Sequence, residues 1–150
     1  MVYNYTLTAG VVGWLVAQIL KTAINLIQSR HFHAERLIGA GGMPSSHTAM
    51  VTAAVISVGR TSGTASTEFA LVFLFSAIVV YDAMGVRRAA GLHAREINNM
   101  KRLIPELLNP SQNGKKIKEL QEYIGHTPLE VCGGFVVGIL TAFLLPVSVS

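Results

Sequence analysis

Four apolar runs constrain the fold of this 150-residue chain more than any other feature. They cover about residues 7–27, 46–58, 69–84 and 128–147, in a chain with 51% hydrophobic and 13% charged residues. Average soluble domains carry about 25% charged residues, whereas a helix that spans a bilayer needs about 20 apolar residues. We therefore predict an all-α fold, a polytopic membrane helix bundle of about four transmembrane helices in a single integral membrane domain, residues 1–150.

A long polar stretch, residues 87–125, separates the third apolar run from the fourth. Pro105, Pro110 and Asn113-Gly114 interrupt it and are typical helix breakers. Leu92 to Leu108 has the pattern of an amphipathic helix that lies on the membrane surface, and Lys115 to Tyr123 that of a short second one.

The distribution of charge predicts the orientation of the bundle. Four spans place loops 30–45 and 87–125 on one face, and both termini with loop 59–68 on the other. All five histidines and ten of the twelve Lys and Arg residues belong to the first face, which the positive-inside rule makes cytoplasmic. We expect an integral protein of the plasma (inner) membrane, and no nucleic-acid partner. The ten are Arg30, Arg36, Arg87, Arg88, Arg95, Lys101, Arg102, Lys115, Lys116 and Lys118.

A histidine motif, Pro44-Ser45-Ser46-His47, precedes the second apolar run and follows two glycines. The first turn of a helix has N–H groups without carbonyl partners, which attract anions. One reading is a phosphate pocket in which Ser45 and Ser46 donate hydrogen bonds and His47 carries a proton. The other is an ordinary helix with a serine cap and an incidental histidine.

A second histidine motif, Gly125-His126-Thr127-Pro128-Leu129-Glu130, precedes the fourth run. Thr127 and Glu130 fit a capping box with proline at the first helical position. Glu130 then either accepts from a backbone N–H or holds one ring nitrogen of His126, which makes the other nitrogen a better nucleophile. The pattern by itself favours the cap.

Three cationic residues are candidates for phosphate binding. Lys21 lies deep in the first run, where a charge costs about 3 kcal/mol, so it either turns inward toward a phosphate or snorkels to the interface. Arg87 and Arg88 follow the third run; they either bind phosphate oxygens in bidentate fashion or only anchor the helix. Asp82 is expected to pair with one of these cations.

No metal or cofactor is expected. His31-Phe32-His33 has two histidines at close spacing but no cysteine or carboxylate cluster beside it, as a metal site would need. Gly134 and Gly138, four residues apart, permit close helix packing. The glycine-rich faces are also compatible with a homo-oligomer.

The two histidine motifs together resemble the signature of type 2 phosphatidic acid phosphatases and vanadium-dependent haloperoxidases. GGMPSSHTA, YDAMGVRRAAG and GHTPLEV are more closely similar to the small, divergent membrane members of that superfamily, over nearly the whole chain. The resemblance implies that His126 attacks phosphorus to form a phosphohistidine, that His47 protonates the leaving group and that Glu130 orients His126. It also assigns phosphate binding to Lys21 and Ser45.

The resemblance implies hydrolysis of a lipid or isoprenoid phosphate, as a monoester or pyrophosphate, with that lipid and the bilayer as partners. The chain departs from the superfamily pattern at several positions, and Arg87 or Arg88 would have to supply the lost charge. These departures favour the alternative, a non-catalytic membrane protein that binds an anionic lipid head group or a protein partner. The residues at the departing positions are Ser46 for a glycine, Glu130 for an aspartate, Gln28 and Ser29 for Arg-Pro, and Leu120 for an arginine.

Overall fold

The computed structural model describes residues 4–29, 42–103, 119–122 and 124–147. Within these ranges the chain forms five helices and no strand, which confirms the all-α prediction. The helices are α1 (Tyr5–Ser29), α2 (Ser46–Thr61), α3 (Thr67–Met84), α4 (Val86–Leu103) and α5 (Pro128–Leu144).

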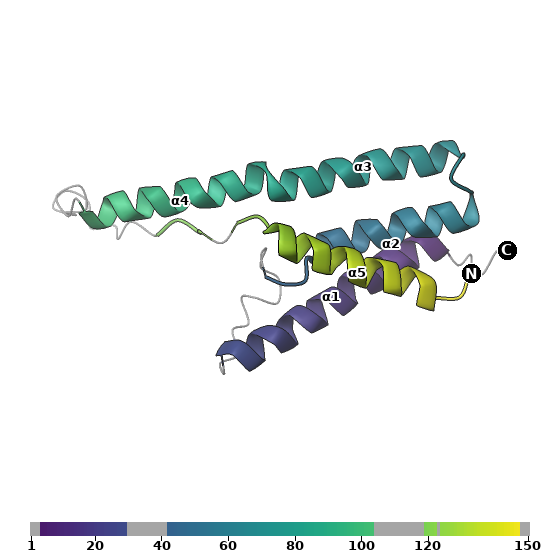
Figure 1. Cartoon of the computed structure of the whole chain (residues 1–150), viewed down its shortest axis with the longest axis horizontal. Helices are drawn as coiled ribbons and strands as arrows, with labels where there is room; N and C mark the ends of the chain where they lie inside the picture. Colours follow the sequence, from purple (N-terminus) through teal and green to yellow (C-terminus); the bar gives the residue numbers. More distant parts are fainter. Residues whose placement is uncertain (1–3, 30–41, 104–118, 123, 148–150) are drawn as a thin grey trace.

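Helix α2 lies at the centre of the bundle and packs against α1, α3 and α5 (Figure 1). The start of α2, the end of α3 and the start of α5 meet at one end of the bundle. The start of α1, the end of α5 and the α2–α3 connection lie at the other end. Both histidine motifs therefore belong to the same end, as the predicted topology requires.

Glycines of α5 let it approach α2 closely. A Cβ on Gly134 would lie 2.5 Å from the Ser45 carbonyl oxygen, and one on Gly138 would lie 2.6 Å from the Ala49 carbonyl oxygen. Only hydrogen fits at these positions, so the pair is a packing motif between helices of the same chain. Since this face is buried within one copy, its glycines do not call for a second copy.

Arg60 ties three helices together at the end opposite the histidines. The Tyr5 hydroxyl donates to the Ala142 carbonyl at 2.6 Å, and Arg60 Nη1 donates both to the Tyr5 hydroxyl oxygen and to the same carbonyl. The guanidinium also lies over the rings of Tyr5 and Phe143. These contacts offset the cost of placing the Arg60 charge at the end of an apolar bundle, and they connect α1, α2 and α5.

The outward surface of the bundle is made of large apolar side chains. Helix α3 exposes Leu71, Phe73, Leu74, Phe75 and Ile78, and α5 exposes a comparable set. Tyr5–Ile27 and a window of Thr67–Leu103 are long and apolar enough to cross a membrane, and Pro128–Leu144 is apolar but shorter. Soluble monomers rarely expose apolar patches of this extent, so the bundle is that of a helical membrane protein, as predicted.

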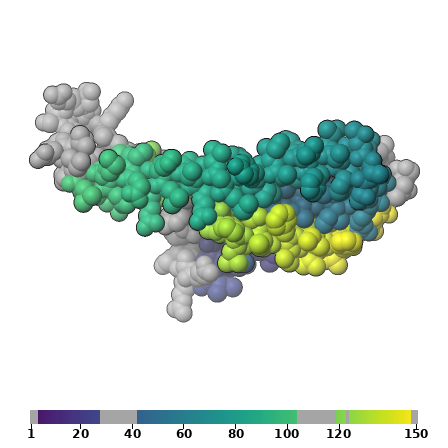
Figure 2. Space-filling model, turned by 45° about the horizontal axis from the view of Figure 1, so that its top comes forward, coloured from purple at the N-terminus to yellow at the C-terminus, as the bar shows by residue number. Residues whose placement is uncertain are grey.

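Helix α4 continues the line of α3 and leaves the bundle (Figures 1 and 2). The predicted start of this amphipathic helix at Leu92 is wrong, because α4 begins at Val86, directly after Gly85. The predicted short helix Lys115–Tyr123 is also wrong where the structure describes it, since residues 119–122 are not helical. Residues 115–118 and 123 lie outside the described ranges.

Candidate functional site

The two histidine motifs meet although 79 positions separate them in the sequence. His47 lies in the first turn of α2 and His126 lies just before α5. Their ring centroids are 6.2 Å apart and the ring planes are inclined by 52°. Each ring nitrogen reaches about 2.6–3.2 Å in a hydrogen bond, so the separation of the rings is compatible with a phosphoryl group that contacts both.

A backbone contact joins the motifs. The N–H of Ser45 donates to the carbonyl of Glu130 at 2.9 Å. Ser45 caps α2, because its Oγ accepts from the N–H of Thr48 at 3.3 Å and from the Thr48 hydroxyl at 3.0 Å. Both bonds use Ser45 Oγ as an acceptor, so its own hydroxyl hydrogen can still be donated. Ser46, the other predicted donor, is buried as well.

Glu130 performs both roles that the sequence left open. Its Oε2 lies 2.9 Å from Nδ1 of His126, and the same oxygen accepts from the N–H of Thr127 at 3.2 Å. The capping box is complete, since Thr127 Oγ1 accepts from the Glu130 N–H. With a proton on Nδ1 directed at the carboxylate, Nε2 carries the lone pair of the His126 ring.

His126 is held from a second side by α3. Its backbone N–H donates to the Ala83 carbonyl at 3.0 Å, near the end of α3, and the residue is only 4% exposed. A buried imidazole fixed at its backbone and at one ring nitrogen has little freedom to turn. This preorganisation is what a nucleophilic histidine requires.

Lys21 faces the interior of the bundle and does not snorkel. It is 2% exposed, and its stem packs on the loop that precedes α2, where a Cβ on Gly42 would lie 3.1 Å from Lys21 Cδ. Its ammonium group is close enough to act electrostatically on Glu130 and on His47. The structure therefore brings the predicted lysine near His47 and near Glu130, the partner of His126.

The two predicted arginines differ in position. Arg87 Nε donates to Asp82 Oδ2 at 2.6 Å, and its charge also acts on His47. Arg88 is exposed, and its backbone packs against Gly125, where a Cβ would lie 2.4 Å from the Arg88 nitrogen. Arg87 is thus the arginine that pairs with Asp82 and whose charge acts on His47.

Asn98, which sequence reasoning missed, holds the segment that leads to His126. Its Nδ2 donates to the carbonyl of Leu120 at 2.8 Å and to Glu122 Oε1 at 2.9 Å, and its Oδ1 accepts from the Leu120 N–H at 3.0 Å. Asn98 is 1% exposed. An asparagine on an amphipathic helix normally faces water, so the sequence contained no signal for this contact.

Replacing Asn98 with alanine should loosen residues 119–122. The Leu120 amide loses its acceptor, and a net loss of about 1 kcal/mol for one hydrogen bond corresponds to exchange with deuterium that is roughly fivefold faster. Hydrogen–deuterium exchange with mass spectrometry measures this directly. Asn99→Ala changes the neighbouring residue and should leave the exchange of residues 119–122 unaltered. Equal exchange rates in the two variants would show that Asn98 does not hold this segment.

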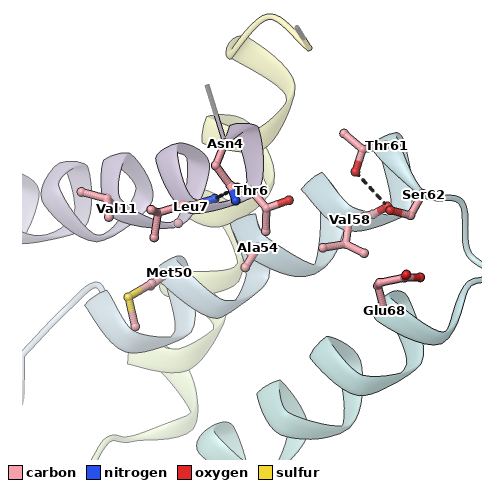
Figure 3. A pocket seen from close by; sticks show the side chains of 11 residues that line it. Asn4, Thr6, Leu7, Val11, Met50, Ala54, Val58, Thr61, Ser62 and Glu68 are labelled. Carbon is pink, nitrogen blue, oxygen red and sulfur yellow. Dashed lines mark hydrogen bonds between the residues drawn. The ribbon is translucent and has the colours of Figure 1, made fainter. Parts of the chain in front are cut away.

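One hollow of the structure lies away from the histidine pair. A hollow of about 450 Å³ between α1, α2 and the start of α3 lies at the opposite end (Figure 3), and Glu68 is the charged residue among those that line it.

Within residues 4–29, 42–103, 119–122 and 124–147, no three His, Cys or carboxylate side chains gather as metal ligands would. His31 and His33 lie outside the described residues.

Comparison with known proteins identifies the family of this chain. It is 36% identical over 148 residues to the uncharacterized membrane protein YuiD of Bacillus subtilis (strain 168), and the alignment covers 95% of this chain and 94% of that relative. No solved structure matches it. The divergent PAP2 family matches residues 2–141, which include both histidine motifs and every candidate site residue. The chain is therefore a membrane protein that belongs to the divergent PAP2 family.

Proposed function

We propose that this protein hydrolyses a lipid or isoprenoid phosphate, as a monoester or pyrophosphate, at the cytoplasmic face of the membrane through a phosphohistidine. The observation that carries the proposal is the histidine pair, with ring centroids 6.2 Å apart and a carboxylate 2.9 Å from one ring. An oriented histidine beside a second histidine supplies a nucleophile and a general acid. Family membership supports a relation to phosphatases.

The reaction follows from the roles of the two rings. Nε2 of His126 attacks phosphorus, the bond from phosphorus to the ester oxygen breaks, and His47 in its imidazolium form protonates the departing oxygen. The neutral His47 then takes a proton from water, which attacks the phosphohistidine and releases phosphate. Glu130 stabilises the positive charge that His126 gains while it is phosphorylated.

Positive charge near the rings would stabilise the phosphoryl group, because catalysis of phosphoryl transfer is mainly electrostatic. Lys21 and Arg87 both act on His47. The hydroxyl of Ser45 and the N–H groups at the start of α2 add donors. Arg87 would take the place of an arginine that the broader superfamily has six residues before the nucleophile, where this chain has Leu120.

One observation favours a second function, binding without turnover. Arg87 is already paired with Asp82 at 2.6 Å, and Glu130 acts on Lys21. The carboxylates therefore offset part of the cationic charge, which suits affinity for an anionic lipid head group better than it suits acceleration of phosphoryl transfer. In this alternative the same pocket holds the phosphate of a lipid and no bond to phosphorus forms.

Trapping the intermediate separates the two functions. The purified protein in detergent is mixed with radiolabelled dodecyl phosphate, quenched in alkali and digested, because phosphohistidine survives base but not acid. We expect label on the peptide that contains His126. Thermal protection by phosphate or vanadate without any label on His126, across monoesters and pyrophosphates, would refute hydrolysis and support binding alone.

A further inference from the structure

An apolar groove of about 400 Å³ lies between α2, α3 and α5. All three helices are visible on the face shown in Figure 2. Helix α3 contributes residues from Phe73 to Met84, α2 contributes residues from Val51 to Ile56, and α5 contributes Phe135. Three lining residues carry hydroxyl groups, Thr52, Ser76 and Tyr81, and the Ser76 hydroxyl donates to the Val72 carbonyl at 2.7 Å. The other lining residues are apolar, so most of the wall suits hydrocarbon.

One end of the groove adjoins the histidine pair. Val51 lies one helical turn after His47, on the same side of α2. Met84 follows Ala83, whose carbonyl accepts the His126 N–H. The other end is at Phe73, eleven residues back along α3, or about 16 Å at the helical rise. One end of the groove therefore lies one helical turn from His47 along α2 and beside the residue that accepts the His126 N–H, and the other end lies in the apolar part of the bundle.

The groove is also open toward the bilayer. Phe73 is 53% exposed and Tyr81 is 75% exposed. The small side chain of Ala77 between them leaves the groove open on this side. A hydrocarbon chain can therefore enter sideways from the membrane without crossing water. A closed cavity would have required the helices to separate first.

We propose that this groove holds the hydrocarbon chain of the lipid phosphate, one chain at a time. The inference rests on the proposed phosphate site between His47 and His126. One water molecule takes about 30 Å³ of liquid volume, and a methylene group is of similar size, so 400 Å³ accommodates roughly a dozen methylene groups. A single chain of that length spans the groove, whereas two chains side by side do not fit.

A photo-reactive lipid tests the placement. Dodecyl phosphate with a diazirine on its last carbon is irradiated with the purified full-length protein, and the labelled peptides are mapped by mass spectrometry. We expect label near Phe73 on α3 and near Ile56 on α2, and we expect vanadate to suppress it. Ala77→Phe fills the groove and should lower this labelling roughly tenfold. Ala70→Phe, on the same helix outside the groove, should not.

Two further probes make each part of the proposal refutable. A diazirine dodecanol lacks the phosphate and should label the groove weakly and without sensitivity to vanadate. If both probes label it equally, the groove holds ordinary bilayer lipid and the proposal is overturned. Dodecyl phosphate should compete for labelling better than a two-chain phosphatidate; equal competition would refute the limit of one chain.

Labelling and turnover report on different claims, because labelling needs no bond to be broken. Vanadate-sensitive label in the groove without phosphohistidine would refute hydrolysis and leave the groove assigned to a bound lipid phosphate. Phosphohistidine on His126 with label outside the groove would refute the placement of the hydrocarbon chain in the groove and leave the proposed hydrolysis intact.

Discussion

His126→Ala should abolish phosphate release from every substrate, together with the trapped phosphoryl group. The variant lacks the nitrogen that we propose attacks phosphorus. In the part of the chain that the structure describes, His126 is the histidine held by Glu130 at 2.9 Å and by the Ala83 carbonyl at 3.0 Å, and His47 has neither contact. Phosphate release and base-stable label on the protein measure the two losses. His93→Ala, an exposed position on α4, is the matched control and should retain full activity.

His47→Ala distinguishes a general acid from a second binding group. A dodecyl leaving group needs a proton, so its release should fall by about 10²–10⁴-fold, the usual contribution of general acid catalysis. Nitrophenyl phosphate has a leaving group that departs without a proton and should lose far less. An equal loss for both substrates would show that His47 only binds phosphate, and residual turnover in His126→Ala would remove the phosphohistidine from the mechanism.

Gly134→Ala should destabilise the bundle. Its Cβ would lie 2.5 Å from the Ser45 carbonyl oxygen and 2.7 Å from Thr48 Cβ. Neither atom can shift cheaply, because Ser45 caps α2 and its N–H is bonded to Glu130. We expect a net loss of about 1–3 kcal/mol from overpacking, although alanine favours a helix by about 1 kcal/mol over glycine. Thermal unfolding in detergent measures the loss.

The same substitution should also lower activity, because α2 must move away from α5 and carry His47 with it. Gly10→Ala is the matched control: its Cβ would meet Met50 at 3.6 Å, an ordinary contact. This variant should be neutral or up to about 1 kcal/mol more stable. If Gly134→Ala unfolds at the same temperature as Gly10→Ala, close packing of α5 on α2 does not position the site.

Local signals accounted for much of the site. The serine before α2 and the Thr127–Glu130 box cap the helices they were predicted to cap, because capping needs only residues within one turn. A lysine inside an apolar run cannot lie against lipid without a large cost, and Lys21 is accordingly buried. The functional roles of these residues remain predictions.

Contacts between distant segments were beyond sequence reasoning. The sequence predicted a gap between the third span, which ends at residue 84, and an amphipathic helix that begins at Leu92. Instead, the Gly85 N–H bonds to the Tyr81 carbonyl and its own carbonyl accepts from Ala89, so α4 starts at once in nearly the same direction. Asn98 reaches Leu120 across 22 positions. Arg87 and Arg88 are equivalent in the sequence. Only their orientation on the helix decides that Arg87 pairs with Asp82 and acts on His47.

Long apolar runs, caps and the position of Lys21 were enough to determine an all-helical membrane bundle with two histidines at helix starts, because each depends on neighbours in the chain. The distance between those histidines, the double role of Glu130 and the groove beside α3 were decided by tertiary structure. They depend on how closely α5 packs on α2, and that closeness is set by glycines whose lack of a side chain has an effect only when a second helix is in contact.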